Sequence, residues 1–173
     1  MNSEERRRKI MEILTQAGEP VTGSTLASNL KVSRQVIVQD IALLRAQGQK
    51  ILATPGGYTV LEAEPAAGGI VKLVAVKHGR SETQDELYTM VDSGAEVIDV
   101  TVDHPVYGQL TGQLSLKTRS DVDRFIRTME ESGAGLLSSL TGGVHLHTVR
   151  VPDLETFERL GGALRSKGFL LYD

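Results

Sequence analysis

A short stretch rich in proline, glycine and alanine, at residues 62–69, most constrains how this chain can fold. The stretch has no periodic apolar pattern, and its composition is typical of a linker. A chain of 173 residues can hold one large domain or two compact ones. The linker favours two, and we expect domains at residues 1–62 and 70–173, joined by residues 63–69.

Charge is distributed unevenly across this linker. The formal net charge of −3 argues against nucleic-acid binding when it is taken for the whole chain, because phosphates require local positive potential. Residues 1–62, however, carry 8 Lys and Arg against 6 Asp and Glu, a net charge of +2. Residues 63–173 carry 11 against 16, a net charge of −5. Any nucleic-acid binding is therefore expected from the N-terminal domain.

Composition limits the other classes of protein. Apolar residues make up 40% and charged residues 24%, which favours folded cores over disorder. The absence of cysteine excludes disulfides, thiolate metal sites and cysteine nucleophiles, and it suits a reducing compartment. No apolar run approaches the roughly 18 residues that span a bilayer, so we expect a cytoplasmic protein with no membrane partner.

The N-terminal domain is predicted to contain three helices. The first covers residues 4–17, Thr22 caps a short second helix, and Ser33 caps a third that ends near residue 47. The third helix turns an apolar stripe towards the core, at Ile37, Ile41 and Leu44. Its other face carries Arg34, Gln35, Val38 and Gln39, and the arginine and glutamines there offer the donors that a helix in the major groove of DNA requires.

Two short strands are predicted next, at residues 50–54 and 58–61, with a turn at Gly56 and Gly57. A three-helix bundle with an incidental hairpin is the alternative. Residues 26–27, 32–35 and 40–48, in this order of elements, nevertheless resemble the winged helix-turn-helix family of bacterial repressors, over about residues 3–62. The resemblance implies that a double-stranded DNA operator is bound through Ser33, Arg34, Gln35, Val38, Gln39, Gly56 and Gly57. Asp40 and Arg45 are interpreted as surface or framework groups.

The C-terminal domain is predicted to follow the order β-α-β-β-α-β-α. Strands are expected at residues 70–76, 96–102, 109–116 and 143–151, and helices at residues 83–91, 121–129 and 154–165. This order indicates an α+β fold, a two-layer α/β sandwich with a mainly antiparallel sheet and a phosphocarrier-like or ferredoxin-like topology. In both topologies the first strand lies beside the fourth and antiparallel to it.

Histidines occupy the strand ends that this pairing brings together. His78 closes the first strand, and His145 and His147 begin the fourth with the i, i+2 spacing that directs both side chains to one face. Glu86 lies on the helix that follows the first strand. Three nitrogens and one oxygen suit a divalent first-row metal such as zinc, nickel, iron or manganese. The alternative is a set of ordinary structural histidines, because four are common for this length.

Residues 78–87, 103–108 and 140–148 resemble the three-histidine (3H) domain, within a similarity that covers about residues 70–172. The best-known members are niacin-responsive repressors of genes for NAD biosynthesis, salvage or niacin uptake. The resemblance implies one divalent metal per chain, with nickel or zinc ahead of iron or manganese. It implies metal ligands at His78, Glu86, His145 and His147.

The resemblance also implies an effector, nicotinic acid or nicotinamide. His104, a histidine of the family pattern, can form a pocket wall with Tyr107. Either the metal itself or Arg150 can supply the cation that a nicotinate carboxylate requires. We expect a homodimer, because helix-turn-helix proteins usually read two half-sites with two-fold symmetry. A metal-sensing repressor is the alternative function. A metal-dependent hydrolase is disfavoured, because the sequence lacks a second acid/base pair, a P-loop and a nucleophile motif near the cluster.

Overall fold

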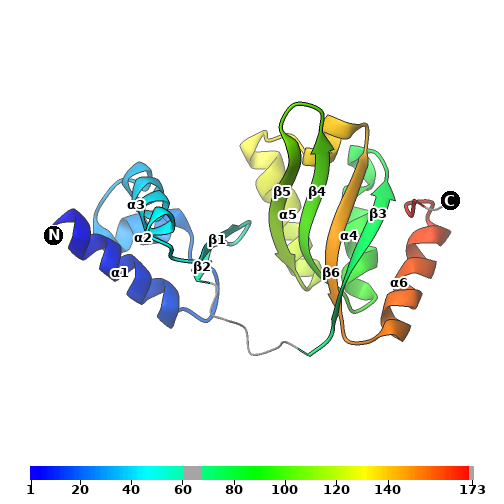
Figure 1. Cartoon of the computed structure of the whole chain (residues 1–173), viewed down its shortest axis with the longest axis horizontal. Coiled ribbons are helices and arrows are strands. Elements are labelled where there is room, and N and C mark those ends of the chain that lie inside the picture. The colour runs from blue at the N-terminus through cyan, green and yellow to red at the C-terminus, as the bar shows by residue number, and fades with distance from the viewer. Residues whose placement is uncertain (61–67, 172–173) are drawn as a thin grey trace. The chain divides into compact units, whose positions relative to one another are not determined.

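The computed structural model describes residues 1–60 and 68–171 (Figure 1). The chain divides into two compact units, Met1–Ala66 and Ala67–Asp173. Most of the linker expected at residues 63–69, and the end of the second wing strand at Leu61, lie outside the described residues. Within the described ranges, no helix is both long and apolar enough to cross a membrane.

The N-terminal unit consists of three helices and a two-stranded sheet, as predicted. Each helix is preceded by a residue whose side chain accepts a backbone hydrogen bond, at Asn2, Thr22 and Ser33. The hairpin that follows is antiparallel, with Ile51 paired to Val60. The elements are α1 (Ser3–Gln16), α2 (Gly23–Leu30), α3 (Arg34–Ala46), β1 (Ile51–Thr54) and β2 (Gly57–Val60).

Two polar groups of α3 fix it to its neighbours. Arg6 Nε on α1 donates to Asp40 Oδ2 at 2.5 Å, although Asp40 is only 2% exposed. Arg45 Nε donates to the backbone carbonyl of Ile51 at 2.8 Å. Both α3 residues are therefore framework groups. The apolar stripe predicted for α3 lies in the core of this unit, at Ile37, Ile41 and Leu44.

The C-terminal unit is a four-stranded antiparallel sheet with three α-helices, which is the predicted α+β sandwich. Its elements are β3 (Ile70–Lys77), the 3-10 helix η1 (Arg80–Glu82), α4 (Thr83–Asp92), β4 (Glu96–His104), β5 (Gly108–Leu116), α5 (Arg119–Ser132), the 3-10 helix η2 (Leu137–Thr141), β6 (Val144–Val151) and α6 (Leu154–Ser166). The strand order is β3-β6-β4-β5 (Figure 1). If the four strands of this sheet are numbered in chain order, their order in the sheet is 1-4-2-3. The first strand is then at the edge, beside the fourth, as in the phosphocarrier-like topology.

The core of this unit lies between the sheet and the helices. Alternate residues of β6 are buried, from His145 to Val151, so these side chains face the helices. In the register of β3 with β6, Val76 pairs with His145 and Val74 pairs with His147, so all four lie on one face. The helices add Leu87, Met90, Val122, Leu160 and Leu164 to this core. Two of the histidines therefore occupy the inner face of the sheet.

Candidate metal centre

Four buried polar side chains meet where β3 ends and β6 begins. His78 directly follows β3, His145 and His147 project from the inner face of β6, and Glu86 projects from α4. Their side chains are at most 3% exposed. Burial of this many polar groups costs free energy unless each finds a partner.

Glu86 contacts all three rings. His78 Nε2 lies 2.6 Å from Glu86 Oε2. His145 Nε2 and His147 Nε2 lie 3.4 and 3.2 Å from Glu86 Oε1. The structure therefore brings together the four residues that were expected from the sequence to be metal ligands. Their ligation of a metal stays a prediction.

A backbone carbonyl orients each imidazole. Nδ1 of His78 lies 2.8 Å from the carbonyl oxygen of Gly79, and Nδ1 of His145 lies 2.9 Å from that of Gly143. Nδ1 of His147 lies 2.8 Å from the carbonyl oxygen of Asp99. A carbonyl oxygen only accepts hydrogen bonds, so each Nδ1 is the donor and carries the ring hydrogen. In the neutral rings all three Nε2 lone pairs then point into the cluster, as metal ligation requires.

Charges within the cluster depend on one another. Burial raises the pKa of Glu86, but the charge of His147 and hydrogen bonds from the histidines outweigh it and lower that pKa well below its ordinary value. Burial lowers the pKa of His78 and His147. The hydrogen bond of His78 to Glu86 and the negative charge of Glu86 beside both rings outweigh burial, and both pKa values are raised. An ionised Glu86 thus favours positive charge among these rings, as protons or as a metal ion.

Two atoms of the cluster have no hydrogen-bond partner among the described residues, Glu86 Oε1 and His147 Nε2. A buried acceptor without a partner is costly, and a cation between the two atoms would remove that cost. Ligand atoms of His78, Glu86 and His145 all lie within 4.8 Å of one another. This donor set of imidazole nitrogens and a carboxylate is typical of divalent first-row metals, so the buried group can hold one.

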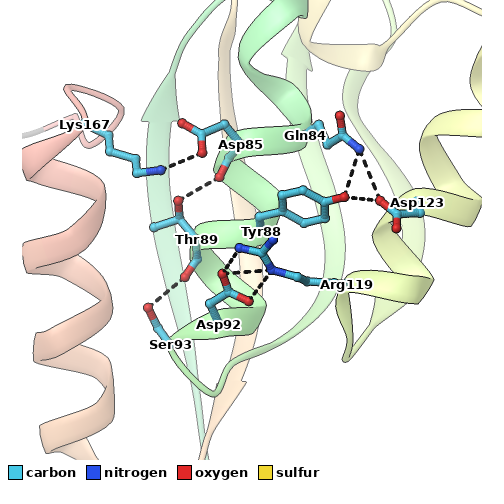
Figure 2. Close-up of polar contacts among 9 residues, drawn as sticks. All are labelled: Gln84, Asp85, Tyr88, Thr89, Asp92, Ser93, Arg119, Asp123 and Lys167. Atoms are coloured by element: carbon cyan, nitrogen blue, oxygen red, sulfur yellow. Dashed lines mark hydrogen bonds and ion pairs between the residues drawn. The ribbon is translucent and has the colours of Figure 1, made fainter.

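Polar contacts on the outer side of α4 hold the helix that carries Glu86 (Figure 2). Tyr88 donates a hydrogen bond to Asp123 on α5. Arg119 binds Asp92 through two nitrogens, with Nη2 2.6 Å from Oδ2. At the opposite side of α4, Lys167 Nζ donates to Asp85 at 2.5 Å. These contacts position α4 between α5 and the end of α6. The network could not be identified from the sequence, because its partners are distant in the chain.

A pocket of about 450 Å³ opens beside His78. Lys77, Arg80, Ser138 and Ser139 line it, so cations and hydroxyl groups lie near the metal centre. Gly143 is required here, because a Cβ atom at this position would lie 2.3 Å from the carbonyl oxygen of His78. Sequence reasoning missed this pocket. Lys77 and Arg80 are close to His78 in the sequence and could have indicated the pocket. Ser138 and Ser139 could not, because only the folding of η2 places them beside His78.

Of the three residues assigned to the effector, His104 and Tyr107 lie together, with ring centroids 5.0 Å apart, and Arg150 lies apart from them. His104 is the last residue of β4, and its Nδ1 accepts hydrogen bonds from the backbone N–H groups of Val106 and Tyr107. Tyr107 is 75% exposed. Arg150 Nη1 donates to Glu96 Oε2 at 2.7 Å, at the start of β4. Arg150 is therefore separated from the pair formed by His104 and Tyr107, and effector binding by these residues stays a prediction.

The DNA face predicted on α3 is accessible. Ser33 caps α3 through its hydroxyl, Arg34, Gln35 and Gln39 are exposed, and Val38 is half-buried. In the wing, Gly57 has a φ of +129°, and a Cβ atom there would lie 2.4 Å from the backbone of Val21. Glycine is therefore needed at 57 for packing, whereas Gly56 lies in the turn itself. DNA contact by these residues stays a prediction.

Comparison with known proteins matches both units to families. Residues 71–173 match the 3H domain, and residues 6–59 match a helix-turn-helix (HTH) domain. The "Probable transcription repressor NiaR" of Thermotoga maritima is 46% identical over 168 residues, which cover 97% of this chain and 94% of that protein. The "Transcription repressor NadR" of Bacillus subtilis is 41% identical over 169 residues, with the same coverage. An uncharacterized protein of Methanothermus fervidus is 27% identical over 105 residues, 57% of this chain and 16% of that protein.

Proposed function

This chain belongs to the family of transcription repressors that join a helix-turn-helix domain to a 3H domain, and we propose that niacin controls its binding to operator DNA. The genes we propose as targets are those of NAD biosynthesis, salvage or niacin uptake. The observation that carries the proposal is that one chain combines a helix α3 that has an exposed polar face with a buried cluster that can hold a metal. The chain is a regulator rather than an enzyme, since its curated relatives are transcription repressors.

For DNA binding, we assign base contacts to Arg34, Gln35 and Gln39. Arginine and glutamine donors can reach the acceptors on base edges in the major groove. The N-terminus of α3, capped by Ser33, and the wing at Gly56 then contact phosphates. A repressor of this type acts where the chromosome is, so we place the protein in the cytoplasm.

For sensing, we assign one divalent metal per chain to His78, Glu86, His145 and His147, with nickel or zinc ahead of iron or manganese. The fit rests on the unpartnered Glu86 Oε1 and His147 Nε2 and on the three Nε2 lone pairs. The bound metal would supply a fixed positive charge at the inner face of the sheet. Asp99, Gly79 and Gly143 orient the rings through their carbonyl groups.

We place the effector, nicotinic acid or nicotinamide, in the pocket beside His78. Lys77 and Arg80 can pair with a carboxylate there, and Ser138 offers a hydroxyl group. The pocket is preferred to Arg150, because Arg150 already pairs with Glu96 and lies at the other end of β4 from His104 and Tyr107.

Operator binding tests this proposal. Promoter fragments of the target genes are titrated with metal-loaded and metal-free protein, each with and without nicotinic acid, and affinity is measured by fluorescence anisotropy at fixed salt. We expect nicotinic acid to change the affinity of the metal-loaded protein by at least about fivefold, the low end of typical coupling. An affinity that follows the metal alone would instead indicate the metal-sensing repressor. No binding to any fragment would overturn the proposed function.

A further inference from the structure

A second cavity lies between the start of α4 and the end of α5. Its volume is about 430 Å³, within the range of roughly 300–1,000 Å³ that holds small molecules. Three half-buried apolar side chains line it, from Ile126 and Met129 on α5 and from Leu136 just before η2. The polar side chains that line it come mainly from η1 and the first turn of α4, and they are Arg80, Ser81, Thr83 and Gln84. Apolar and polar groups thus face one space, as in many ligand sites.

Two opposite charges line this cavity without meeting. Arg80 comes from η1 and Glu130 from the last turn of α5, and both side chains are exposed. Neither forms an ion pair within the part of the chain that the structure describes. A ligand with a single charge would be attracted by one of these groups and repelled by the other. A ligand that carries both charges would satisfy both.

Two polar groups of α4 add hydrogen-bonding capacity. Thr83 is only 8% exposed, and its Oγ1 has no hydrogen-bond partner among the described residues. A buried hydroxyl without a partner is costly, and a ligand carboxylate could accept its hydrogen bond. Gln84 Nε2 donates to Tyr88 Oη at 3.0 Å and to Asp123 Oδ1 at 3.2 Å, which fixes the amide and leaves Oε1 as an acceptor (Figure 2). The cavity therefore offers donors to a carboxylate and acceptors to an ammonium group.

We propose that this cavity is a second ligand site, which binds an α-amino acid with an apolar side chain. The carboxylate of the ligand pairs with Arg80 and accepts a hydrogen bond from Thr83. Its ammonium group pairs with Glu130, and its side chain packs on the apolar residues of α5 and on Leu136. The site is distinct from the pocket beside His78, although Arg80 lines both. The inference goes beyond the proposed function, because the site needs neither nicotinic acid nor DNA.

Isothermal titration calorimetry with the metal-loaded full chain tests the site, with L-leucine as the probe. We expect one L-leucine to bind per chain, with a Kd of about 1 mM or below. 4-Methylpentanoate has the same carbon chain and carboxylate but no ammonium group, and it should bind at least about tenfold more weakly. L-Alanine lacks most of the apolar side chain and should also bind at least about tenfold more weakly. No binding of L-leucine, or equal binding of the three compounds, would overturn the proposal.

Glu130→Gln tests the contact with the ammonium group, and Arg80 is left intact because it also lines the pocket beside His78. The variant should bind L-leucine at least about tenfold more weakly, whereas the affinity for 4-methylpentanoate should not fall, because only the ammonium group meets Glu130. The control is Glu131→Gln, an exposed carboxylate next in the sequence that does not line the cavity, and it should change neither affinity. Equal weakening of both compounds by Glu130→Gln would show a structural effect and overturn this contact.

Thr83→Val separates folding from binding. Valine has nearly the shape of threonine without the unpartnered hydroxyl, so the melting temperature of the C-terminal unit should not fall. L-Leucine should bind at least about threefold more weakly, because its carboxylate loses one hydrogen bond. An unchanged affinity for L-leucine would overturn the contact with Thr83.

Discussion

The two units of the chain bury charge in opposite ways. In the N-terminal unit the buried carboxylate, Asp40, has Arg6 at 2.5 Å and Arg7 at 3.7 Å, and the side chains assigned to base contacts, Arg34, Gln35 and Gln39, stay exposed. In the C-terminal unit the buried carboxylate, Glu86, keeps an oxygen without a hydrogen-bond partner, and the groups assigned to the metal lie with it inside the core. The first arrangement is complete within the protein, whereas the second has the donor set to hold a cation, which we assign to it. The stability of the two units should therefore respond to different perturbations.

Metal removal should produce the largest difference between the units. At a metal concentration of about 1,000 times Kd, chelation should destabilise the C-terminal unit by about 4 kcal/mol and leave the N-terminal unit unchanged. Hydrogen exchange followed by mass spectrometry measures both units in one sample. Equal loss of hydrogen-exchange protection in the two units would contradict the difference between them.

The double variant His145→Ala with His147→Ala tests the proposed metal site directly, by the amount of metal that the protein binds. Elemental analysis should give about one equivalent in the untagged wild type and little in the double variant, since two of four ligands are removed. His104→Ala, at the exposed turn after β4, is the matched control and should keep the metal. Equal or negligible metal in the wild type and the double variant would contradict the assignment.

Asp40→Asn should have the next largest effect, and only on the N-terminal unit. The change leaves Arg6 without its buried counter-charge, which should destabilise this unit by about 3 kcal/mol. Asp92→Asn breaks a similar bidentate contact with Arg119, but this pair is exposed and the destabilisation should be much smaller. Urea unfolding, monitored by hydrogen exchange in each unit, measures both variants. Similar destabilisation in the two variants would show that burial of Asp40 is unimportant.

Arg34→Ala with Gln35→Ala should weaken operator binding by about 1 to 3 kcal/mol for each hydrogen-bonded base that the variant no longer reads. Stability should be unaffected, because both side chains are exposed. Anisotropy at matched salt measures the affinity. The control is Arg127→Ala with Gln109→Ala, the same residue types exposed on the C-terminal unit. Unchanged affinity in the α3 variant would remove these residues from the DNA surface.

The effect that is smallest for each step of the perturbation is the pH dependence of metal affinity in the C-terminal unit. In the metal-free protein the pKa values of His78 and His147 are raised, so protons compete with the metal at and above pH 6.5, the ordinary histidine value. Metal affinity should therefore rise with pH through this range and fall below it, by about tenfold per pH unit for each proton displaced. The pKa of Glu86 is lowered, so its proton does not compete there. Titration with a metal indicator from pH 5.5 to 8 measures this, and a flat profile would contradict it.

Sequence determined the features that depend on near neighbours. Thr22 and Ser33 were identified as caps because their hydroxyl groups bond a backbone N–H three residues later. The common face of His145 and His147 follows from the two-residue period of a strand. His78 could be added because the order of elements predicts that the first strand pairs with the fourth, and Glu86 because it lies on the helix that follows the first strand. These are local geometry and simple topology, and the structure confirms both.

Tertiary structure decided what depends on residues far apart in the chain. Arg6 and Asp40 are 34 positions apart, and His147 and Asp99 are 48 apart, so no sequence period relates them. Arg150 on β6 pairs with Glu96 at the start of β4, whereas His104 is at the end of β4, and the serines beside His78 are placed there by η2. The physical reason is that packing chooses such partners by shape and by the need to satisfy buried polar groups. Sequence thus specified which groups are available for chemistry, and the fold decided which of them meet.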